Sequence, residues 1–538
     1  MGEARQTADG PSRLATANRF FSLARLLLLI AIVGLVSALV LPGCGEGGEK
    51  QTVRVFGTVY EITKADDPNQ EQFAFTRARQ VYECLVWYDV FTDSYQPRLA
   101  ESWERSDDGL IWTFHLRKGV KFQDGSDFDS KAVKLSYESA LKGPAAWHLD
   151  PIESVEFPDS HTAVFKLKYP YPILYSLSQS PFIVSPAAVE KYGADAYLPG
   201  KGAGTGPYML KDAKTTVECT LERFPDYWGG WDGEHAKAAD IWIIRTIAEP
   251  AARVQNLEQG AIQLMYPVPP TDVERLKSTG KFEVVTQNTS EGVVAHFNTK
   301  LAPTDDVNFR KAIFYAMPFD DFVNIAYNGY AISVSGFIGP DMYGYDRQLA
   351  EIGQFEQDMA KAREYLSKSK YPDGGVTVTC LIDNAAAEGI KCLELWKTAL
   401  AELNITLDVQ PINISVIFNE ALSDPTHNVY AFPKPGLAAG VGTLELDLSS
   451  TSNFNFSYYT DPKIDQFIKD GYAALCLDQR DKAVDILLEA DRLLMDVVPE
   501  VRLAFKVALS GCSADLNFKG MVNTSYDIPS LYDCLIEK

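Results

Sequence analysis

The chain has 538 residues, of which 46% are hydrophobic and 12% aromatic, and its formal net charge is −22 at pH 7. This composition is ordinary for a packed globular protein, and the length is enough for two or three domains. A surface this acidic repels phosphate groups, so the composition argues against a nucleic-acid partner and against electrostatic docking on anionic lipid.

The amino-terminal segment has the features of an export signal. Arginines precede a continuous apolar run over residues 26–41, which is shorter than the roughly 20 residues that a membrane-spanning helix needs. The run ends in Leu41-Pro42-Gly43-Cys44, which resembles the lipobox of bacterial lipoproteins and implies cleavage before Cys44 and lipid on its sulfur. We therefore expect residues 1–43 to be a signal peptide, residues 44–50 to be a lipidated tether, and the rest to lie on the extracytoplasmic face of the cell membrane. The alternative is an uncleaved signal anchor, which also faces outward.

The remaining cysteines and the histidines show no metal-binding spacing. There is no Cys-x-x-Cys pair and no His-x-x-x-His pair, so we expect no metal site. The number of cysteines after Cys44 is odd, so at least one is free or pairs between chains. Cys380 with Cys392, and Cys512 with Cys534, are the neighbours in sequence that an oxidising environment is able to join.

Strand-like and helix-like patterns alternate along the chain. Alternation of apolar side chains predicts strands at 53–55, 111–116, 164–167 and 501–507. Helical spacing predicts helices over 390–403 and 484–497. Mixed strands and helices over this length, with no internal repeat, predict α/β domains.

Two motifs between residues 97 and 125 point to a family. The first is Pro97-Arg98-Leu99-Ala100-Glu101-Ser102-Trp103-Glu104, and the second is Trp112-Thr113-Phe114-His115-Leu116-Arg117-Lys118-Gly119-Val120-Lys121-Phe122-Gln123-Asp124-Gly125. Both closely resemble the family 5 extracellular solute-binding proteins, which serve oligopeptide, dipeptide and nickel ABC importers. Further matches follow in the family's order: Gly204-Thr205-Gly206-Pro207-Tyr208, Asp226-Tyr227-Trp228-Gly229-Gly230, Phe297-Asn298-Thr299 and Lys463-Ile464-Asp465.

The resemblance implies an α/β fold of the periplasmic-binding-protein type, in its large type II variant with three domains, whose two lobes close on ligand at a hinge. Domain I would be discontinuous, and domain II would be inserted into it. The implied bounds are 51–81, 187–290 and 505–538 for domain I, 82–186 for domain II and 291–504 for domain III. We also expect a monomer without cofactor that delivers oligopeptides or dipeptides to the permease and ATPase subunits of an ABC importer.

The ligand-binding stretch departs from the family's pattern. Peptide-binding members pair the peptide's amino terminus with an aspartate that follows a tryptophan. The corresponding stretch here is Tyr430-Ala431-Phe432-Pro433-Lys434-Pro435-Gly436, which has no acidic residue near Phe432 or Pro433. Burying an ammonium group without a partner costs several kcal/mol. A ligand other than a peptide with a free amino terminus is therefore an alternative.

Aromatic and amide side chains near this stretch suit peptide bonds, sugars or capped ligands. Together with an aromatic residue that the resemblance places in domain II, they form the predicted set of ligand contacts. That set is Tyr430, Phe432, Trp147, Asn453, Asn455, Tyr458 and Tyr459.

Two alternatives to a peptide importer remain. The first is a protein of the same fold that binds a nickel chelate, an oligosaccharide or another small solute, or that presents its ligand to a sensor. The other is an enzyme, since Ser139-Ala140-Leu141-Lys142 has the Ser-x-x-Lys form of penicillin-interacting enzymes. The accompanying Ser-Asp-Asn and Lys-Thr-Gly elements are missing, so we expect no catalytic residues.

Overall fold

The computed structural model describes residues 51–59, 66–70, 75–144, 146–437, 440–523 and 528–537. From Thr52 onward these belong to one compact unit. The expected signal peptide and the lipidation residue Cys44 lie outside the described residues. Among the helices that are described, none has the length and apolar character needed to cross a bilayer.

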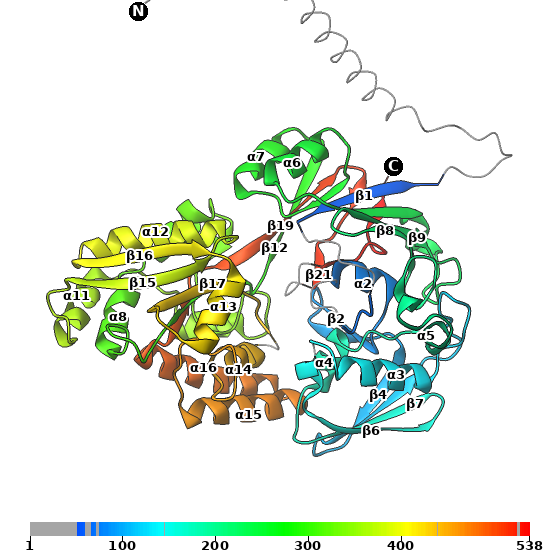
Figure 1. The fold of residues 1–538 in the computed structure, drawn as a ribbon, viewed down its shortest axis with the longest axis horizontal. Coiled ribbons are helices and arrows are strands. Elements are labelled where there is room, and N and C mark those ends of the chain that lie inside the picture. The colour runs from blue at the N-terminus through cyan, green and yellow to red at the C-terminus, as the bar shows by residue number, and fades with distance from the viewer. Residues whose placement is uncertain are drawn as a thin grey trace, which may run out of the picture. The chain divides into compact units, whose positions relative to one another are not determined.

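The first sheet collects strands from distant parts of the chain (Figure 1). Strand β1 pairs in parallel with β10 and β11, and the other ladders are antiparallel. Across the sheet the order is β12 (Phe282–Asn288), β19 (Phe505–Ser513), β11 (Leu264–Tyr266), β1 (Val53–Thr58), β10 (Ile241–Thr246), β9 (Glu218–Arg223) and β8 (Tyr208–Lys214), with β14 (Ala331–Ile332) on β19. The predicted strand at 53–55 is confirmed as part of β1.

The second sheet carries parallel and antiparallel pairs. Its order is β16 (Ile405–Ile412), β15 (Val376–Asp383), β17 (Val429–Lys434), β13 (Gly292–Phe297) and β18 (Glu500–Arg502). Helix α12 (Ala387–Ala401) confirms the helix predicted over 390–403, and it buries Leu393, Trp396 and Leu400 in the core beneath the sheet. Helices α8 (Val307–Tyr315) and α11 (Met359–Lys368) add to the same core.

The third sheet is antiparallel throughout. Its order is β4 (Ala100–Arg105), β5 (Ile111–Leu116), β7 (Thr162–Leu167) and β6 (Ile152–Asp159), so the strands predicted at 111–116 and 164–167 are confirmed. Trp112, Phe114 and Leu116 on β5 are buried in alternation with less buried neighbours, because successive side chains of a strand point to opposite faces. Helix α3 (Ser130–Ala140) begins where the Asp129 carboxylate accepts a hydrogen bond from the Lys131 amide at 2.8 Å.

The prediction of one strand over 501–507 is wrong, because the chain changes sheets there. Strand β18 ends at Arg502 in the second sheet, and β19 begins at Phe505 in the first. The neighbouring residues Leu503 and Ala504 are both fully buried, which interrupts the alternation between two faces. A second crossing, between β12 and β13, runs beside it, since the Thr289 hydroxyl donates to the Lys506 carbonyl at 2.7 Å.

Three helices pack against the third sheet. They are α14 (Val441–Leu448), α15 (Pro462–Cys476) and α16 (Arg480–Val497), and α16 confirms the helix predicted over 484–497. Their side chains share one hydrophobic core with the third sheet, in which the rings of Tyr171 and Tyr472 lie 4.7 Å apart. Apart from strand β14, all strands of each large sheet fall within one predicted domain. This observation supports the predicted domain bounds, which stay a prediction.

Shorter elements complete the described fold. The remaining α-helices are α2 (Phe75–Val81), α4 (Ile173–Gln179), α5 (Pro186–Tyr192), α6 (Pro250–Glu258), α7 (Val273–Ser278), α9 (Phe319–Asp321), α10 (Tyr345–Ile352) and α13 (Ile414–Ser423). Three strand pairs are β2 (Val86–Asp89) with β3 (Ser94–Pro97), β20 (Leu516–Asn517) with β23 (Leu535–Ile536), and β21 (Met521–Asn523) with β22 (Ile528–Pro529).

The cysteines of the described residues are all free and buried. Neither Cys380 with Cys392 nor Cys512 with Cys534 forms a disulfide. Burial raises the pKa of Cys84 to about 11 and that of Cys512 to about 12. These thiols therefore stay protonated near neutral pH, when they are poor nucleophiles.

Candidate functional site

A cavity of about 160 Å³ lies between the β2–β3 hairpin, helix α4 and the start of α16. One side of its wall comes from residues 88–112 and 172–179, which belong to predicted domain II. The other side comes from residues 341–343, 436 and 475–484, which belong to predicted domain III. A cavity of this size admits a compact organic group. It is therefore a site that two separate parts of the fold build together.

The wall of this cavity combines aromatic rings with charged groups. Its rings are Tyr88, Tyr95, Trp112, Tyr175 and Tyr343. Its charged side chains are Asp93, Asp341, Asp478 and Arg480. Aromatic side chains that carry O–H or N–H groups offer apolar contact and hydrogen bonds together, which is typical of sites for small polar solutes.

An ion pair joins the two sides of the cavity wall. Asp93 lies in the turn of the β2–β3 hairpin, and Arg480 is the first residue of α16. One guanidinium nitrogen of Arg480 lies 2.6 Å from the Asp93 carboxylate, and another donates to the Asp93 carbonyl at 3.0 Å. The Tyr88 hydroxyl donates to the same carboxylate at 2.5 Å. Burial, and then this hydrogen bond, raise the pKa of Tyr88, so the hydroxyl stays a donor.

A second ion pair lies at the edge of the cavity. The Arg105 guanidinium, at the end of β4, is 2.9 Å from the Asp478 carboxylate in the turn between α15 and α16. Arg105 also donates to the carbonyl of Cys476, a residue of the cavity wall. Both ion pairs thus connect predicted domain II with predicted domain III beside the same cavity.

Two of the predicted contacts, Tyr430 and Phe432, are buried on strand β17. They pack in a hydrophobic cluster with Phe456, and the Tyr430 hydroxyl donates to the Glu420 carboxylate at 3.0 Å. Neither residue lines the cavity, but Gly436, at the end of the predicted stretch, does. The stretch therefore reaches the cavity at its carboxyl end.

The other predicted contacts lie in two further places. Asn455 and Tyr458 hold the loop after α14, since the Asn455 amide donates to the Tyr459 carbonyl at 2.8 Å and the Tyr458 hydroxyl donates to the Ala421 carbonyl at 2.7 Å. Asn453 is exposed on that loop. Trp147 is 47% exposed and stacks on His148 with ring centroids 3.6 Å apart. None of these lines the cavity in the described structure, and their contact with ligand stays a prediction.

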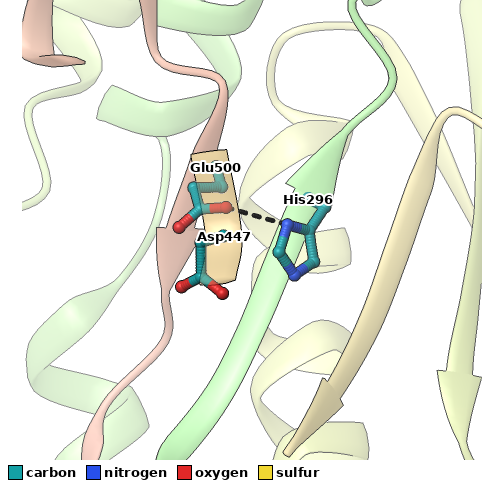
Figure 2. Close-up of side chains that lie close together, drawn as sticks. All are labelled: His296, Asp447 and Glu500. Atoms are coloured by element: carbon teal, nitrogen blue, oxygen red, sulfur yellow. Dashed lines mark ion pairs between the residues drawn. The ribbon is translucent and has the colours of Figure 1, made fainter. Parts of the chain in front are cut away.

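A buried charged cluster lies between the second sheet and α14 (Figure 2). Ligand atoms of His296 on β13, Asp447 on α14 and Glu500 on β18 all lie within 4.8 Å of one another, and His296 Nδ1 is 2.8 Å from a Glu500 oxygen. The sequence does not predict this cluster, because its members are far apart in the chain and follow no metal-ligand spacing.

The cluster already holds its own cations. The Lys434 ammonium contacts the Asp447 carboxylate, and Arg502 lies on the same strand as Glu500. Burial, and then the charge of Lys434, lower the pKa of His296 well below its usual value, so the imidazole is neutral. The positive charges of Lys434 and Arg502 thus act on both carboxylates of the cluster.

Comparison with known proteins gives one family match. Residues 94–434 match the family described as "Bacterial extracellular solute-binding proteins, family 5 Middle". The chain is also 28% identical over 438 residues to the glutathione-binding protein GsiB of Salmonella choleraesuis (strain SC-B67), covering 78% of this chain and 82% of GsiB.

Two solved structures show the same fold. The periplasmic binding protein DppA from Helicobacter pylori, in complex with the peptide STSA, matches with a TM-score of 0.73 and 22% identity, over 91% of this chain and 99% of DppA. NikA from Staphylococcus aureus, in complex with Ni(L-His)2, matches with a TM-score of 0.71 and 18% identity, over 90% of this chain and 100% of NikA. The α/β fold of the periplasmic-binding-protein type, expected from the sequence, is confirmed.

Proposed function

The chain belongs to the bacterial extracellular solute-binding proteins of family 5, and from this membership we propose that it is the substrate-binding protein of an ABC importer for peptides or small peptide-like solutes. The family consists of binding proteins and not of enzymes, as the sequence predicts. The observation that carries the proposal to this chain is the aromatic cavity whose wall comes from two separate parts of the fold. The binding of glutathione by GsiB and of a peptide by DppA supports the choice of solute.

Asp341 takes the role of the aspartate that is missing from the stretch 430–436. It lies on the cavity wall with Gly436, and both are close to Ser290: the Ser290 hydroxyl donates to the Asp341 carboxylate, and a side chain at Gly436 would collide with Ser290. A carboxylate at this place pairs with the α-ammonium group of a solute. The departure in the stretch is thereby compensated from a loop about 90 residues earlier in the sequence.

Closure follows from the way the cavity is built. A solute that contacts residues of both predicted domains binds the closed arrangement better than an open one, and so shifts the population toward closure. The two adjacent crossings between the first and second sheets are the hinge. The permease then receives the closed, loaded form.

Attachment to the membrane is part of the same proposal. The apolar run before Cys44 and the lipobox-like sequence support a lipid anchor. An extracellular binding protein that is tethered beside its permease delivers solute at a high effective concentration.

The experiment compares two peptides and two variants of the purified protein. Native mass spectrometry and calorimetry measure binding of a short peptide with a free amino terminus and of the same peptide acetylated there. We expect one peptide per chain, and a loss of about tenfold or more in affinity for the free-amine peptide in Asp341→Asn, because a hydrogen-bonded charge pair is lost. The acetylated peptide should bind both forms equally.

The matched control is Asp346→Asn, which removes the same charge from an exposed residue on α10 outside the cavity. It should bind the peptide as the parent protein does. A folded protein that binds no peptide from a mixed pool, but retains a nickel chelate or an oligosaccharide, would reject the peptide proposal. Unchanged affinity in Asp341→Asn would reject the role of Asp341 alone.

A further inference from the structure

Arg98 differs from the other arginines that the structure describes. Most of these donate to a carboxylate, as Arg54 does to Asp515 at 2.7 Å, or to backbone carbonyls, as Arg310 does to Thr304 at 2.8 Å. No hydrogen bond and no ion pair of the described residues involves the guanidinium of Arg98. A partly buried cation in this position lacks an acceptor, although the protein is strongly acidic.

Arg98 lines a small cavity of about 30 Å³, which is separate from the aromatic cavity. The cavity lies between α2, the β2–β3 hairpin and the carboxyl-terminal residues 529–532. Its wall also contains Arg79, Trp87 and Tyr532. One bound water needs roughly 10–15 Å³ of cavity volume, so the cavity has room for two oxygen atoms of one oxyanion, whose remaining atoms face its opening.

A second guanidinium lies beside the same ring as the first. The carbon at the centre of the Arg98 guanidinium is 5.1 Å from the centroid of the Trp87 ring, and that of Arg79 is 5.4 Å from it. The indole attracts each cation, but the two cations repel each other. Both arginines line the same small cavity, so an anion in that cavity would be attracted by both of them.

The acidic group in the wall, Glu83, attracts the Arg98 guanidinium electrostatically but makes no direct bond to it. Glu83 accepts hydrogen bonds from the Tyr227 hydroxyl at 3.1 Å and from the Trp228 indole N–H at 2.8 Å, and it forms no ion pair with Arg98. Burial raises the pKa of Glu83, which weakens it further as a counter-charge. Asp533, the next acid, accepts from the Ser530 hydroxyl at 2.5 Å and faces His235 at 3.0 Å.

We propose that this cavity binds an oxyanion, a carboxylate or a phosphate, with the Arg98 guanidinium as its main donor and Arg79 as the second positive charge. A guanidinium presents its N–H groups in a planar fork that matches two oxygens of one oxyanion. The site is distinct from the ammonium position at Asp341, since the two lie in different cavities.

The position of the cavity gives the oxyanion two sources. Trp87 and Tyr88 are neighbours on β2 and point to opposite faces of that strand, so Trp87 lines the small cavity and Tyr88 lines the aromatic one. Arg79 also donates to Gln179 of the aromatic cavity at 2.9 Å. The anion is either a carboxylate of the captured solute or a free inorganic ion.

The first test uses inorganic phosphate as the probe on the whole protein. Thermal unfolding and calorimetry are measured in sodium phosphate and in sodium chloride of equal ionic strength. We expect phosphate to raise the midpoint of unfolding, and Arg98→Met to weaken phosphate binding by at least about tenfold, because a charged donor is lost. Arg98→Lys keeps the charge but lacks the planar fork of N–H groups. Its phosphate affinity should lie between those of the parent protein and Arg98→Met, and phosphate binding by this variant would show that the site folds without arginine.

The matched control is Arg363→Met. Arg363 lies on α11, outside the cavity, and forms an exposed ion pair with Glu402, so this variant also removes one positive charge. This variant should bind phosphate as the parent protein does. The proposal is overturned if neither phosphate nor sulfate stabilises the parent protein more than chloride does, while Arg98→Met binds peptides with unchanged affinity. It is also overturned if both methionine variants respond to phosphate alike.

The second test separates the two sources. A peptide with a free carboxyl terminus is compared with the same peptide amidated there. If the solute supplies the anion, phosphate competes with the free-carboxyl peptide, and amidation weakens binding to the parent protein but not to Arg98→Met. If the anion is free, phosphate and peptide bind together. The phosphate test is independent of peptide transport, so a protein that takes up no peptide but binds phosphate through Arg98 rejects the proposed function and retains this inference.

Discussion

Asp491, a buried carboxyl group on α16, makes the stability of the protein depend on pH. Its side chain is 3% exposed and accepts one hydrogen bond, from the Phe337 amide at 3.0 Å. Burial raises the pKa of Asp491 to about 8. The folded chain therefore binds more protons at this residue than the unfolded chain does between about pH 4 and pH 8, and the free energy of unfolding falls as pH rises through that range.

We expect Asp491→Asn to remove this dependence without changing the shape of the side chain. Near pH 7 the variant should be more stable than the parent protein by about 2–4 kcal/mol, and near pH 4 the two should be alike. Chemical denaturation at a series of pH values measures the difference. The control is Asp485→Asn on the same helix, where the carboxylate is exposed and pairs with Arg347. An equal gain in both variants, or a gain that persists at pH 4, would contradict the prediction.

Single residues were the hardest part of the site to predict from the sequence. Tyr430 and Phe432 are aromatic residues in a stretch that resembles the family's ligand-binding stretch. Alternation along β17 indicates only that both face the interior, and it does not distinguish a core from a cavity. The structure buries them beside Phe456. Tyr88, Tyr175 and the other rings of the cavity wall carry no such pattern. They meet only because hairpin turns and helix ends from distant segments converge, and such contacts depend on the tertiary fold.

At the scale of elements, an ion pair fastens helix α14 to strand β17. Lys434 ends β17, Asp447 lies in the last turn of α14, and both side chains are almost fully buried. The Arg502 guanidinium donates to the Lys434 carbonyl at 2.9 Å. The segment between the two elements includes Gly436 of the cavity wall, so the pair also sets the position of that wall.

Removing one partner of this pair should be costly, and removing both should not. A buried charge without its partner destabilises a fold by about 3–5 kcal/mol, whereas replacing a buried pair by apolar residues is often neutral or stabilising. We expect Lys434→Met to lose stability in that range and Lys434→Met with Asp447→Leu to recover most of it. Denaturation of the four members of this cycle gives the coupling energy. A double variant as unstable as the sum of its two single variants would show that the side chains act separately.

Elements with strong periodicity were predictable where one core covers them. Helix α12 follows its apolar spacing, and strand β5 follows its alternation, because each buries one face in a single core. The passage after Arg502 was predicted wrongly, because β18 and β19 lie in different sheets but together continue a nearly regular alternation of apolar residues. Periodicity records burial, and it does not record which sheet provides the burial.

At the scale of the molecule, the two ion pairs beside the aromatic cavity connect predicted domains II and III and should affect how readily the protein closes. Asp93 with Arg480, and Arg105 with Asp478, are partly exposed, so each contributes only about 0.2–1 kcal/mol. We expect Asp93→Asn with Asp478→Asn to increase the radius of gyration of the solute-free protein in X-ray scattering. Sodium chloride at about 0.5 M should act in the same direction, because salt screens exposed pairs. Added solute should restore the smaller radius in the variant, with an affinity reduced by about twofold to tenfold.

The control for this prediction is an ion pair of similar exposure that lies within one predicted domain. Asp485→Asn breaks the pair of α16 with Arg347 on α10 and should leave the radius of gyration unchanged. The competing force is the shared hydrophobic core, in which Tyr171 and Tyr472 meet across the same boundary. If the radius stays constant in the double variant and in high salt, that core alone holds predicted domains II and III together. The hinge proposed at the crossings beside Thr289 and Ala504, where the chain passes between the first and second sheets, would then not open in the solute-free protein.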